Sequence, residues 1–215
     1  HRLIRRQRQM CIRDRGRTGV ATPYAELEEV DLDGVKIKSA SLHNIDYIDF
    51  NDIRVGDKVV VERAGDVIPQ VIEVSKSNIR GPNSKKFRMP ENCPVCNSKL
   101  FKKLDDPFTK CLNSECDDQI KRSLEHFSSK NCVEIEGLGE GIINILFQNN
   151  LVNSIIDLYS LEYEELIKLE GFQDKSVNNL LDSVSKSKNV TPEKLLHGLG
   201  IPPVSYTHLR AHETG

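Results

Sequence analysis

The chain carries the sequence CPVC at residues 93–96 and CLNSEC at residues 111–116. Two close cysteine pairs joined by a short hairpin can bring four thiolates to the corners of one tetrahedron. Because four protein ligands leave no open coordination position, the spacing predicts a structural zinc ion rather than a catalytic one. The predicted ligands are Cys93, Cys96, Cys111 and Cys116. Disulfides are the alternative, but they need an oxidising compartment, and nothing in the sequence indicates export.

The segment before the cysteines, residues 16–78, has the pattern of a small β-structure. Stretches rich in β-branched residues at 59–61 and 67–74 are separated by the turn sequence RAGD at 63–66. Short strands at this spacing predict a barrel or a sandwich. Residues 79–92 have no apolar period, so they are expected to be a linker.

Residues 117–202 have apolar side chains at helical spacing, which predicts an all-helical segment. Within it, IEGLG at 135–139 recurs 34 residues later as LEGFQ at 169–173. A Gly-containing turn before a helix can direct backbone N–H groups and the helix N-terminus at one phosphate. The candidate phosphate-binding residues are Gly137, Gly139 and Gly171. An ordinary Gly turn between packed helices is the alternative, and Cys132 is expected to be a buried core thiol.

The two ends of the chain, residues 1–15 and 203–215, differ in character from the segment between them. The first is rich in Arg without a clear period, and the second is polar. Three interpretations are open: disordered tails, a basic arm that binds nucleic acid, and translated sequencing-adapter read-through. We favour read-through, because strings such as RQRQMCIRD and VSYTHLRAHE resemble it. No function is therefore assigned to either end.

The composition is typical of a soluble globular protein with small domains. Of 215 residues, 38% are hydrophobic and 29% are charged, and the formal net charge is −2. No run approaches the roughly 20 apolar residues that cross a bilayer, so no membrane partner is expected. Residues 79–131 contain eleven Lys or Arg against seven Asp or Glu. A phosphate-binding surface is expected to use this basic centre, although lysines on the cysteine hairpin fit a solvated face equally well.

Three further strings indicate a family. GRTG at 16–19, SLHN at 41–44 and RAGDVIPQ at 63–70 resemble the OB-fold domain of bacterial NAD-dependent DNA ligase. The four cysteines and the Gly-containing turns follow in that family's order. The resemblance implies a multidomain α+β chain. Its parts are an OB-fold β-barrel at 16–78, a linker at 79–92, a small four-cysteine zinc finger at 93–116 and a truncated all-α helix-hairpin-helix domain at 117–202.

What the resemblance implies is an enzyme of DNA replication and repair. It seals 5′-phosphate/3′-hydroxyl nicks in duplex DNA through lysyl-AMP and DNA-adenylate intermediates. The intact enzyme uses NAD and Mg²⁺, and the expected setting is a monomer in the bacterial cytoplasm, associated with the nucleoid. The OB domain would hold the minor groove through polar contacts from Arg17, Thr18 and Arg63. Val67 and Ile68 would pack against the sugar–base edge, and the Gly-containing turns would hold the phosphate backbone.

Two features depart from that family. Gln173 stands where the second hairpin usually has Gly, which puts the phosphate contact of that turn in doubt. No Lys-x-Asp-Gly string occurs, so no residue of the chain is a candidate for the lysyl-AMP nucleophile. The chain is therefore expected to bind nicked DNA and zinc without ligating, with no catalytic residue of its own.

Two other classes stay open. A non-enzymatic protein that binds single-stranded nucleic acid would need stacking aromatic residues on the barrel, where residues 16–78 offer Tyr24, Tyr47 and Phe50. The other class is a structural or interaction module in which zinc merely joins two domains. Such a module would show no salt-dependent affinity for DNA. Another class of enzyme is not indicated, because the sequence has neither a P-loop nor a dinucleotide-binding Gly motif.

Overall fold

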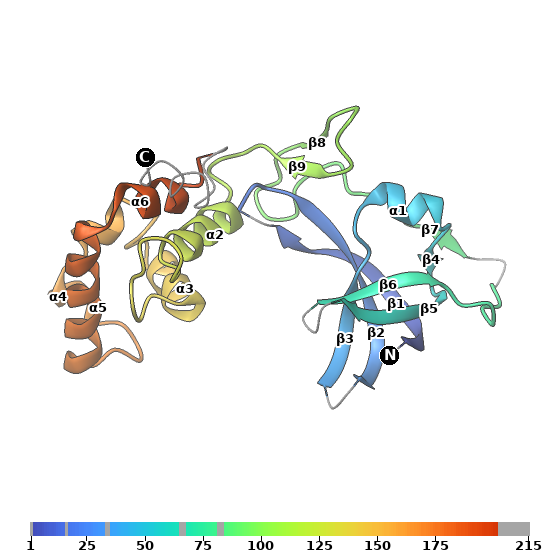
Figure 1. The fold of residues 1–215 in the computed structure, drawn as a ribbon, viewed down its shortest axis with the longest axis horizontal. Coiled ribbons are helices and arrows are strands. Elements are labelled where there is room, and N and C mark those ends of the chain that lie inside the picture. Colours follow the sequence, from blue (N-terminus) through green and yellow to red (C-terminus); the bar gives the residue numbers. More distant parts are fainter. Residues whose placement is uncertain (1, 16, 33–34, 65–67, 81–83, 202–215) are drawn as a thin grey trace, which may run out of the picture. The chain divides into compact units, whose positions relative to one another are not determined.

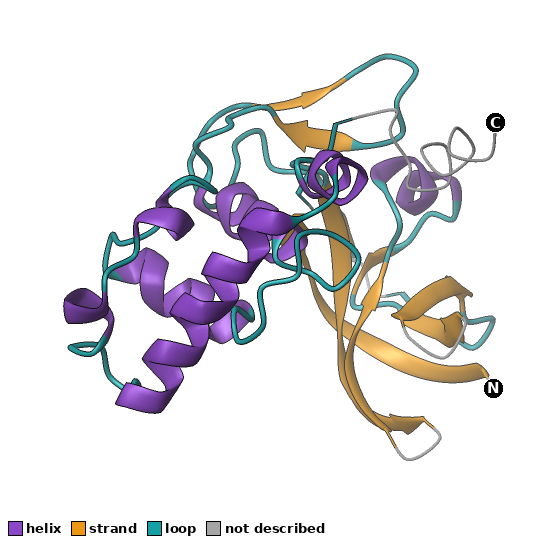
Figure 2. Cartoon of the chain, turned by 60° about the vertical axis from the view of Figure 1, so that its left-hand side comes forward, coloured by secondary structure: helices purple, strands orange, loops and turns teal. Residues whose placement is uncertain are grey.

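The computed structural model describes residues 2–15, 17–32, 35–64, 68–80 and 84–201 (Figure 1). The chain divides into two compact units, residues 1–116 and 117–215. Among the described residues, the strands lie in the first unit, and every helix except one short one lies in the second (Figure 2). No helix in the described ranges is both long and apolar enough to cross a membrane.

Five strands of the first unit form a closed barrel in the order β1-β2-β3-β6-β5. They are β1 Arg2–Arg15, β2 Ala21–Leu32, β3 Val35–Ser41, β5 Lys58–Ala64 and β6 Ile68–Val74. Neighbours are antiparallel except β3 and β6, which pair in parallel at Ser41 and Gln70. A short helix, α1 (Ile45–Phe50), follows β3, and Asn44 caps it by accepting a hydrogen bond from the Tyr47 N–H at 2.8 Å. The predicted small barrel is confirmed.

The barrel interior is apolar because alternate residues of each strand point inward. On β5, for example, Val59 and Val61 are almost completely buried. Ala25 and Ala40 are completely buried and pair with each other across β2 and β3. The buried core consists of Met10, Ala25, Leu27, Ile37, Ala40, Leu42, Ile48, Ile53, Val59, Val61 and Val71.

The sequence predicts residues 1–15 to be a non-native or disordered tail, whereas in the structure Arg2–Arg15 differ from a disordered tail and form strand β1. Its residues Arg2 to Arg6 pair with β5, and its later residues pair with β2. A β-ladder is built from backbone N–H and C=O groups, so an Arg-rich stretch without an apolar period can still complete it. Irregular pairing between Gln7 and Gln9 marks a β-bulge in the strand.

The expected linker 79–92 is attached to the barrel. Strand β7 (Lys85–Lys86) pairs with β4 (Arg54–Val55). The Arg80 guanidinium contacts the Asp57 carboxylate at 2.9 Å and the Asp52 carboxylate at 2.6 Å. Because the Asp57 side chain is only 2% exposed, this contact neutralises a buried charge.

The hairpin that carries the cysteines also belongs to the first unit. Its strands are β8 (Leu100–Lys102) and β9 (Thr109–Cys111). The Cys111 N–H donates to the Gly19 carbonyl at 2.9 Å, and Val20 forms a β-bridge with Lys110. Lys102 forms an ion pair with Asp46 at 2.5 Å. The hairpin is thus joined to the barrel by backbone as well as side-chain contacts.

The second unit is helical, as the apolar periodicity predicts. Its helices are α2 Asp117–Phe127, α3 Glu140–Gln148, α4 Tyr163–Leu166, α5 Asp174–Lys186 and α6 Pro192–Gly198, with 3₁₀ helices η1 Asp157–Ser160 and η2 Ser187–Asn189. The amphipathic faces meet in a core of Leu124, Phe127, Val133, Ile135, Leu138, Ile143, Leu146, Val152, Leu158, Leu166, Val177, Leu180 and Val184. Burial of these side chains, rather than helix propensity, stabilises such short helices.

Replacing Gln7 with Leu should stabilise the barrel. The Gln7 side chain is buried, and neither polar atom of its amide has a hydrogen-bond partner among the described residues. Such a group costs about 1–2 kcal/mol, so Gln7→Leu should raise the free energy of unfolding by about that amount in urea denaturation. Gln9 is exposed on the same strand, and Gln9→Leu should change stability by less than about 0.5 kcal/mol. Equal effects at both positions would contradict this account.

Arg80→Gln should destabilise the first unit by about 2 kcal/mol at pH 7, because the buried Asp57 carboxylate loses charged hydrogen bonds. Hydrogen bonds from Arg54 and Arg80 lower the pKa of Asp52 to about 2. Burial alone would raise the pKa of Asp57, but hydrogen bonds from Arg80 and the Arg54 backbone outweigh it, and the net pKa is lowered.

The pH dependence of that variant follows from the two lowered pKa values. A carboxylate with a lowered pKa stabilises the folded state above its unfolded pKa of about 3.9, and this contribution disappears as the pH falls through the folded value. The difference between wild type and Arg80→Gln should therefore shrink between about pH 4 and about pH 2 in thermal unfolding. Lys76→Gln, an exposed change of the same charge, should show no such trend.

Candidate metal centre and nucleic-acid interface

The four predicted zinc ligands converge at one point of the first unit. The Sγ atoms of Cys93 and Cys116 are 3.9 Å apart, those of Cys96 and Cys111 are 3.5 Å apart, and all four lie within 4.8 Å of one another. Four thiolates at about 2.3 Å from a tetrahedral zinc ion are separated by about 3.8 Å. The cluster is therefore compatible with zinc, and none of its four cysteines is joined in a disulfide.

Local backbone structure prepares the first cysteine pair for a metal. Asn97 adopts a left-handed conformation with φ 57°, and its N–H donates to the Cys93 carbonyl at 2.9 Å. The Cys93 N–H donates to the Ser98 carbonyl at 2.8 Å, which closes the knuckle. A hydrogen bond from the Ser98 side chain lowers the pKa of the Cys96 thiol to about 6. A lowered pKa favours the thiolate, which is the form that binds a metal.

The lysines of the hairpin are partly neutralised. Lys102 is paired with Asp46, and Lys110 contacts Asp106 at 2.6 Å. Lys99 and Lys103 are exposed. A phosphate-facing patch on this hairpin would therefore depend mainly on those two exposed side chains.

Two predicted DNA contacts lie beside the hairpin. Arg17 and Thr18 occupy the turn that leads to Gly19, the residue whose carbonyl accepts the Cys111 N–H. Gly19 has φ 72°, a left-handed conformation that glycine adopts without strain. Arg17 is partly buried and Thr18 is exposed. Pairing of the hairpin with this turn thus brings the two residues close to the metal centre.

The other DNA-contact residues predicted on the barrel lie only partly within the described part of the chain. Arg63 pairs with Pro69, and Ile68 pairs with Ala64, so β5 and β6 carry Arg63 and Ile68 at the same end of their ladder. The side chains of Arg63 and Ile68, and the whole of Val67, lie outside the described part of the chain.

The two Gly-containing turns of the second unit have the same backbone conformation. The Leu138 N–H donates to the Ile135 carbonyl at 3.2 Å, and 34 residues later the Phe172 N–H donates to the Leu169 carbonyl at 3.2 Å. The third residue of each turn is Gly, with φ 85° at Gly137 and φ 86° at Gly171. A turn of this kind requires positive φ at that position, so the sequence repeat is also a repeat in conformation.

The helices that follow these turns begin differently. Gly139 precedes α3 and has no side chain with which to cap it. Gln173 precedes α5 and forms a capping box, in which its side chain accepts from the Ser176 N–H and its own N–H donates to the Ser176 Oγ at 2.9 Å. One backbone N–H group at the α5 N-terminus therefore already has a hydrogen-bond partner within the protein. Gly139 has no side chain that could accept from an N–H group of α3.

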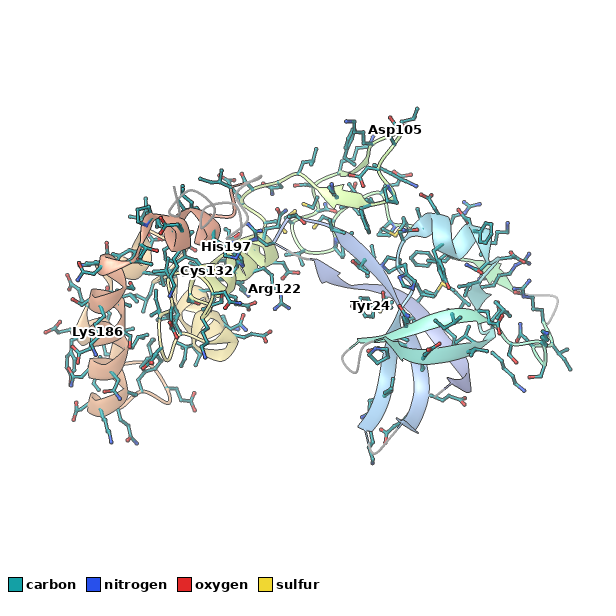
Figure 3. All side chains as sticks on the ribbon, in the orientation of Figure 1. Tyr24, Asp105, Arg122, Cys132, Lys186 and His197 are labelled. Carbon is teal, nitrogen blue, oxygen red and sulfur yellow. The ribbon has the colours of Figure 1, made fainter. Side chains whose placement is uncertain are left out.

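A hollow of about 480 Å³ lies between the two turns. Gly137 and Gly171 line it, together with the carboxylates of Glu136 and Asp182 and the amine of Lys186, which is labelled in Figure 3. Its charge is mixed. Any phosphate bound here would depend on backbone N–H groups more than on basic side chains.

Cys111→Ser should remove the metal from the four-cysteine cluster. Zinc per chain, measured by atomic absorption after dialysis, should fall by about one ion, because a serine hydroxyl does not replace a thiolate ligand. Limited proteolysis should then cut residues 93–116, since these residues bury little apolar surface. Cys11 lies outside the cluster, so Cys11→Ser should retain the metal. Unchanged zinc in Cys111→Ser would contradict the predicted ligand set.

Known proteins are similar to this chain over most of its length. Residues 13–83 match the NAD-dependent DNA ligase OB-fold domain. The chain is 47% identical to the DNA ligase of Oceanobacillus iheyensis, 48% to that of Bacillus subtilis and 46% to that of Thermoanaerobacter sp.. Each match covers 186 residues, which are 86% of this chain and 28% of the relative's length. The chain therefore resembles the central fragment of bacterial NAD-dependent DNA ligase.

Proposed function

We propose that this chain is the DNA-binding part of an NAD-dependent ligase that seals 5′-phosphate/3′-hydroxyl nicks in duplex DNA. The observation that carries the proposal is the combination of a ligase-type OB domain with about 47% identity to bacterial DNA ligases over 86% of the chain. The parent protein would act in replication and repair as a cytoplasmic, nucleoid-associated monomer. Its adenylyl donor would be NAD, and Mg²⁺ would neutralise phosphate charge.

The metal centre would have a structural role in this function. Zinc bound to Cys93, Cys96, Cys111 and Cys116 would stabilise the folded hairpin. The backbone hydrogen bond from Cys111 to Gly19 would then hold the turn that carries Arg17 and Thr18. The four thiolates would fill the coordination sphere of the ion. We therefore assign the zinc no part in catalysis.

We further propose that residues 117–202 form a helix-hairpin-helix domain whose turns hold the phosphate backbone. Support comes from the shared conformation of the turns at Gly137 and Gly171 and from the uncapped start of α3 at Gly139. Exposed N–H groups and the helix dipole bind an anion without net positive charge. The first turn should be the stronger site, because Gln173 occupies an N–H group at the second.

Single-strand binding by stacking is less well supported. Tyr47 is half-buried, its ring contacts His43, and its hydroxyl donates to the Ile72 carbonyl at 2.5 Å. Among the aromatic residues of the barrel segment, Phe50 is the well-exposed one, at 89%. One exposed ring offers no track on which successive bases could stack.

We expect this chain to bind DNA without ligating it. Its sequence contains no Lys-x-Asp-Gly string, so it supplies no nucleophile for adenylyl transfer. The chain would instead bind the DNA substrate. Binding would raise the effective concentration of the nick near catalytic groups that this chain does not supply.

Zinc-loaded protein should bind nicked duplex at least as tightly as intact duplex and more tightly than single strands. Because phosphate contacts release counterions, the affinity should fall at least about tenfold between about 50 and 200 mM salt. Fluorescence anisotropy with the three DNA forms measures both effects. A preference for single strands would favour the non-enzymatic alternative, and salt-independent or absent binding would contradict the proposal.

Gly139→Asp should weaken duplex binding about tenfold, because its carboxylate would repel a phosphate at the start of α3. Gly139 has φ −91°, and no other residue lies within 4 Å of an added Cβ. The substitution therefore fits, and an Asp N-cap should stabilise the helix. Gly139→Ser is the neutral control and should bind within about threefold of wild type. Equal affinities for the Asp and Ser proteins would show that this turn holds no phosphate.

A further inference from the structure

A second group of metal-ligand side chains lies within the helical unit. His126 is in the last turn of α2, Cys132 is in the turn that follows, and His197 is in α6. The Cys132 Sγ is 3.7 Å from the His126 Nε2, and the two imidazole rings are 5.2 Å apart at their centroids. One ligand atom from each residue lies within 4.8 Å of the others. Figure 3 labels Cys132 and His197, which lie together where α6 meets this turn.

We propose that His126, Cys132 and His197 bind a zinc-type transition-metal ion as a second metal site. Two imidazoles and one thiolate suit borderline-soft ions, whereas Mg²⁺ and Ca²⁺ prefer oxygen ligands. Three protein ligands leave one position for water or another donor, unlike the closed four-cysteine cluster. The site is independent of the proposed ligase function, because it rests on residues assigned no role in binding DNA.

Close packing fixes the positions of these ligands. Cys132 is completely buried, and its N–H donates to the Ser129 carbonyl at 2.9 Å. Gly198 lies so close to the turn that an added Cβ would be 3.2 Å from the Phe127 ring and 3.4 Å from the Cys132 Cβ. A larger residue at position 198 would push α6 away from Cys132. Glycine there allows the approach that brings His197 to the other two ligands.

Metal binding would replace an existing contact rather than fill a gap. The His126 Nε2 lies 2.9 Å from the His197 carbonyl oxygen, and this contact joins α2 to α6. To bind the ion through Nε2, His126 would carry its ring proton on Nδ1, and the Cys132 thiol would release its proton to solvent. The ion would then hold the same two helices through coordination bonds.

Solvent can reach one of the ligands. His197 lines a hollow of about 500 Å³ together with Lys130, Asn131, Glu134 and Lys194. Its charged groups are two amines and one carboxylate, so electrostatic attraction does not draw a cation there. Affinity must therefore come from the nitrogen and sulfur ligands themselves, which again favours zinc over hard cations.

The metal content of the full chain tests the proposal. After loading with Zn²⁺ and dialysis, wild type should hold about two zinc ions per chain, and Cys132→Ala about one. Cys11→Ala is the matched control, because it removes a thiol outside both clusters, and it should still hold about two. One ion in wild type, or equal zinc in wild type and Cys132→Ala, would overturn the second site.

A stability measurement separates this site from the four-cysteine cluster and guards against a misfolded variant. In Cys111→Ser, added Zn²⁺ should still raise the thermal midpoint of the helical unit, because binding to the native state alone stabilises it. The shift should disappear in Cys111→Ser combined with His197→Gln, a change at a half-buried position that leaves the buried thiol in place. A zinc-induced shift that persists in the double variant would assign the effect to other residues and contradict the proposal.

Discussion

Closure of the barrel is the constraint on which the rest of the first unit depends. β1 pairs with β2 along one edge and with β5 along the other, so the barrel leaves no long unpaired edge. The turn that follows β1 contains Gly19, and its carbonyl accepts the N–H of a metal-binding cysteine, Cys111. The hydrogen bond from Cys111 to Gly19 and the bridge between Val20 and Lys110 therefore place the metal centre beside the turn that carries Arg17 and Thr18. The spacing of the cysteines in the sequence does not by itself predict where the metal centre lies on the barrel.

Charged groups complete the connection between barrel, linker and hairpin. Arg80 in the linker forms an ion pair with the buried Asp57, and Lys102 in the hairpin forms an ion pair with Asp46. These two ion pairs differ in their contribution to stability, because Asp57 is buried whereas Asp46 is more than half exposed. The first neutralises a charge that would otherwise be costly, and the second is screened by solvent and contributes little. The described residues of the linker, 79–80 and 84–92, are thus part of the folded unit.

The helical unit uses one turn conformation twice with different chemistry at the helix start. Gly137 and Gly171 have nearly the same φ, yet α3 begins at an uncapped Gly139 and α5 begins at a capping Gln173. The same turn conformation therefore leads to two helix starts that differ in whether a backbone N–H group is already occupied by a cap.

Local patterns in the sequence were enough to predict several elements. The cysteine spacing, the apolar period of residues 117–202 and the Gly repeat each depend on neighbours in the chain. In the described residues they are matched by the cysteine cluster, the helices and the paired turns, respectively. Strand β1, the Arg80–Asp57 contact and the meeting of His126 with His197 were decided only by tertiary structure. Each joins groups that lie far apart in sequence, through backbone pairing or packing that leaves no local periodic signal.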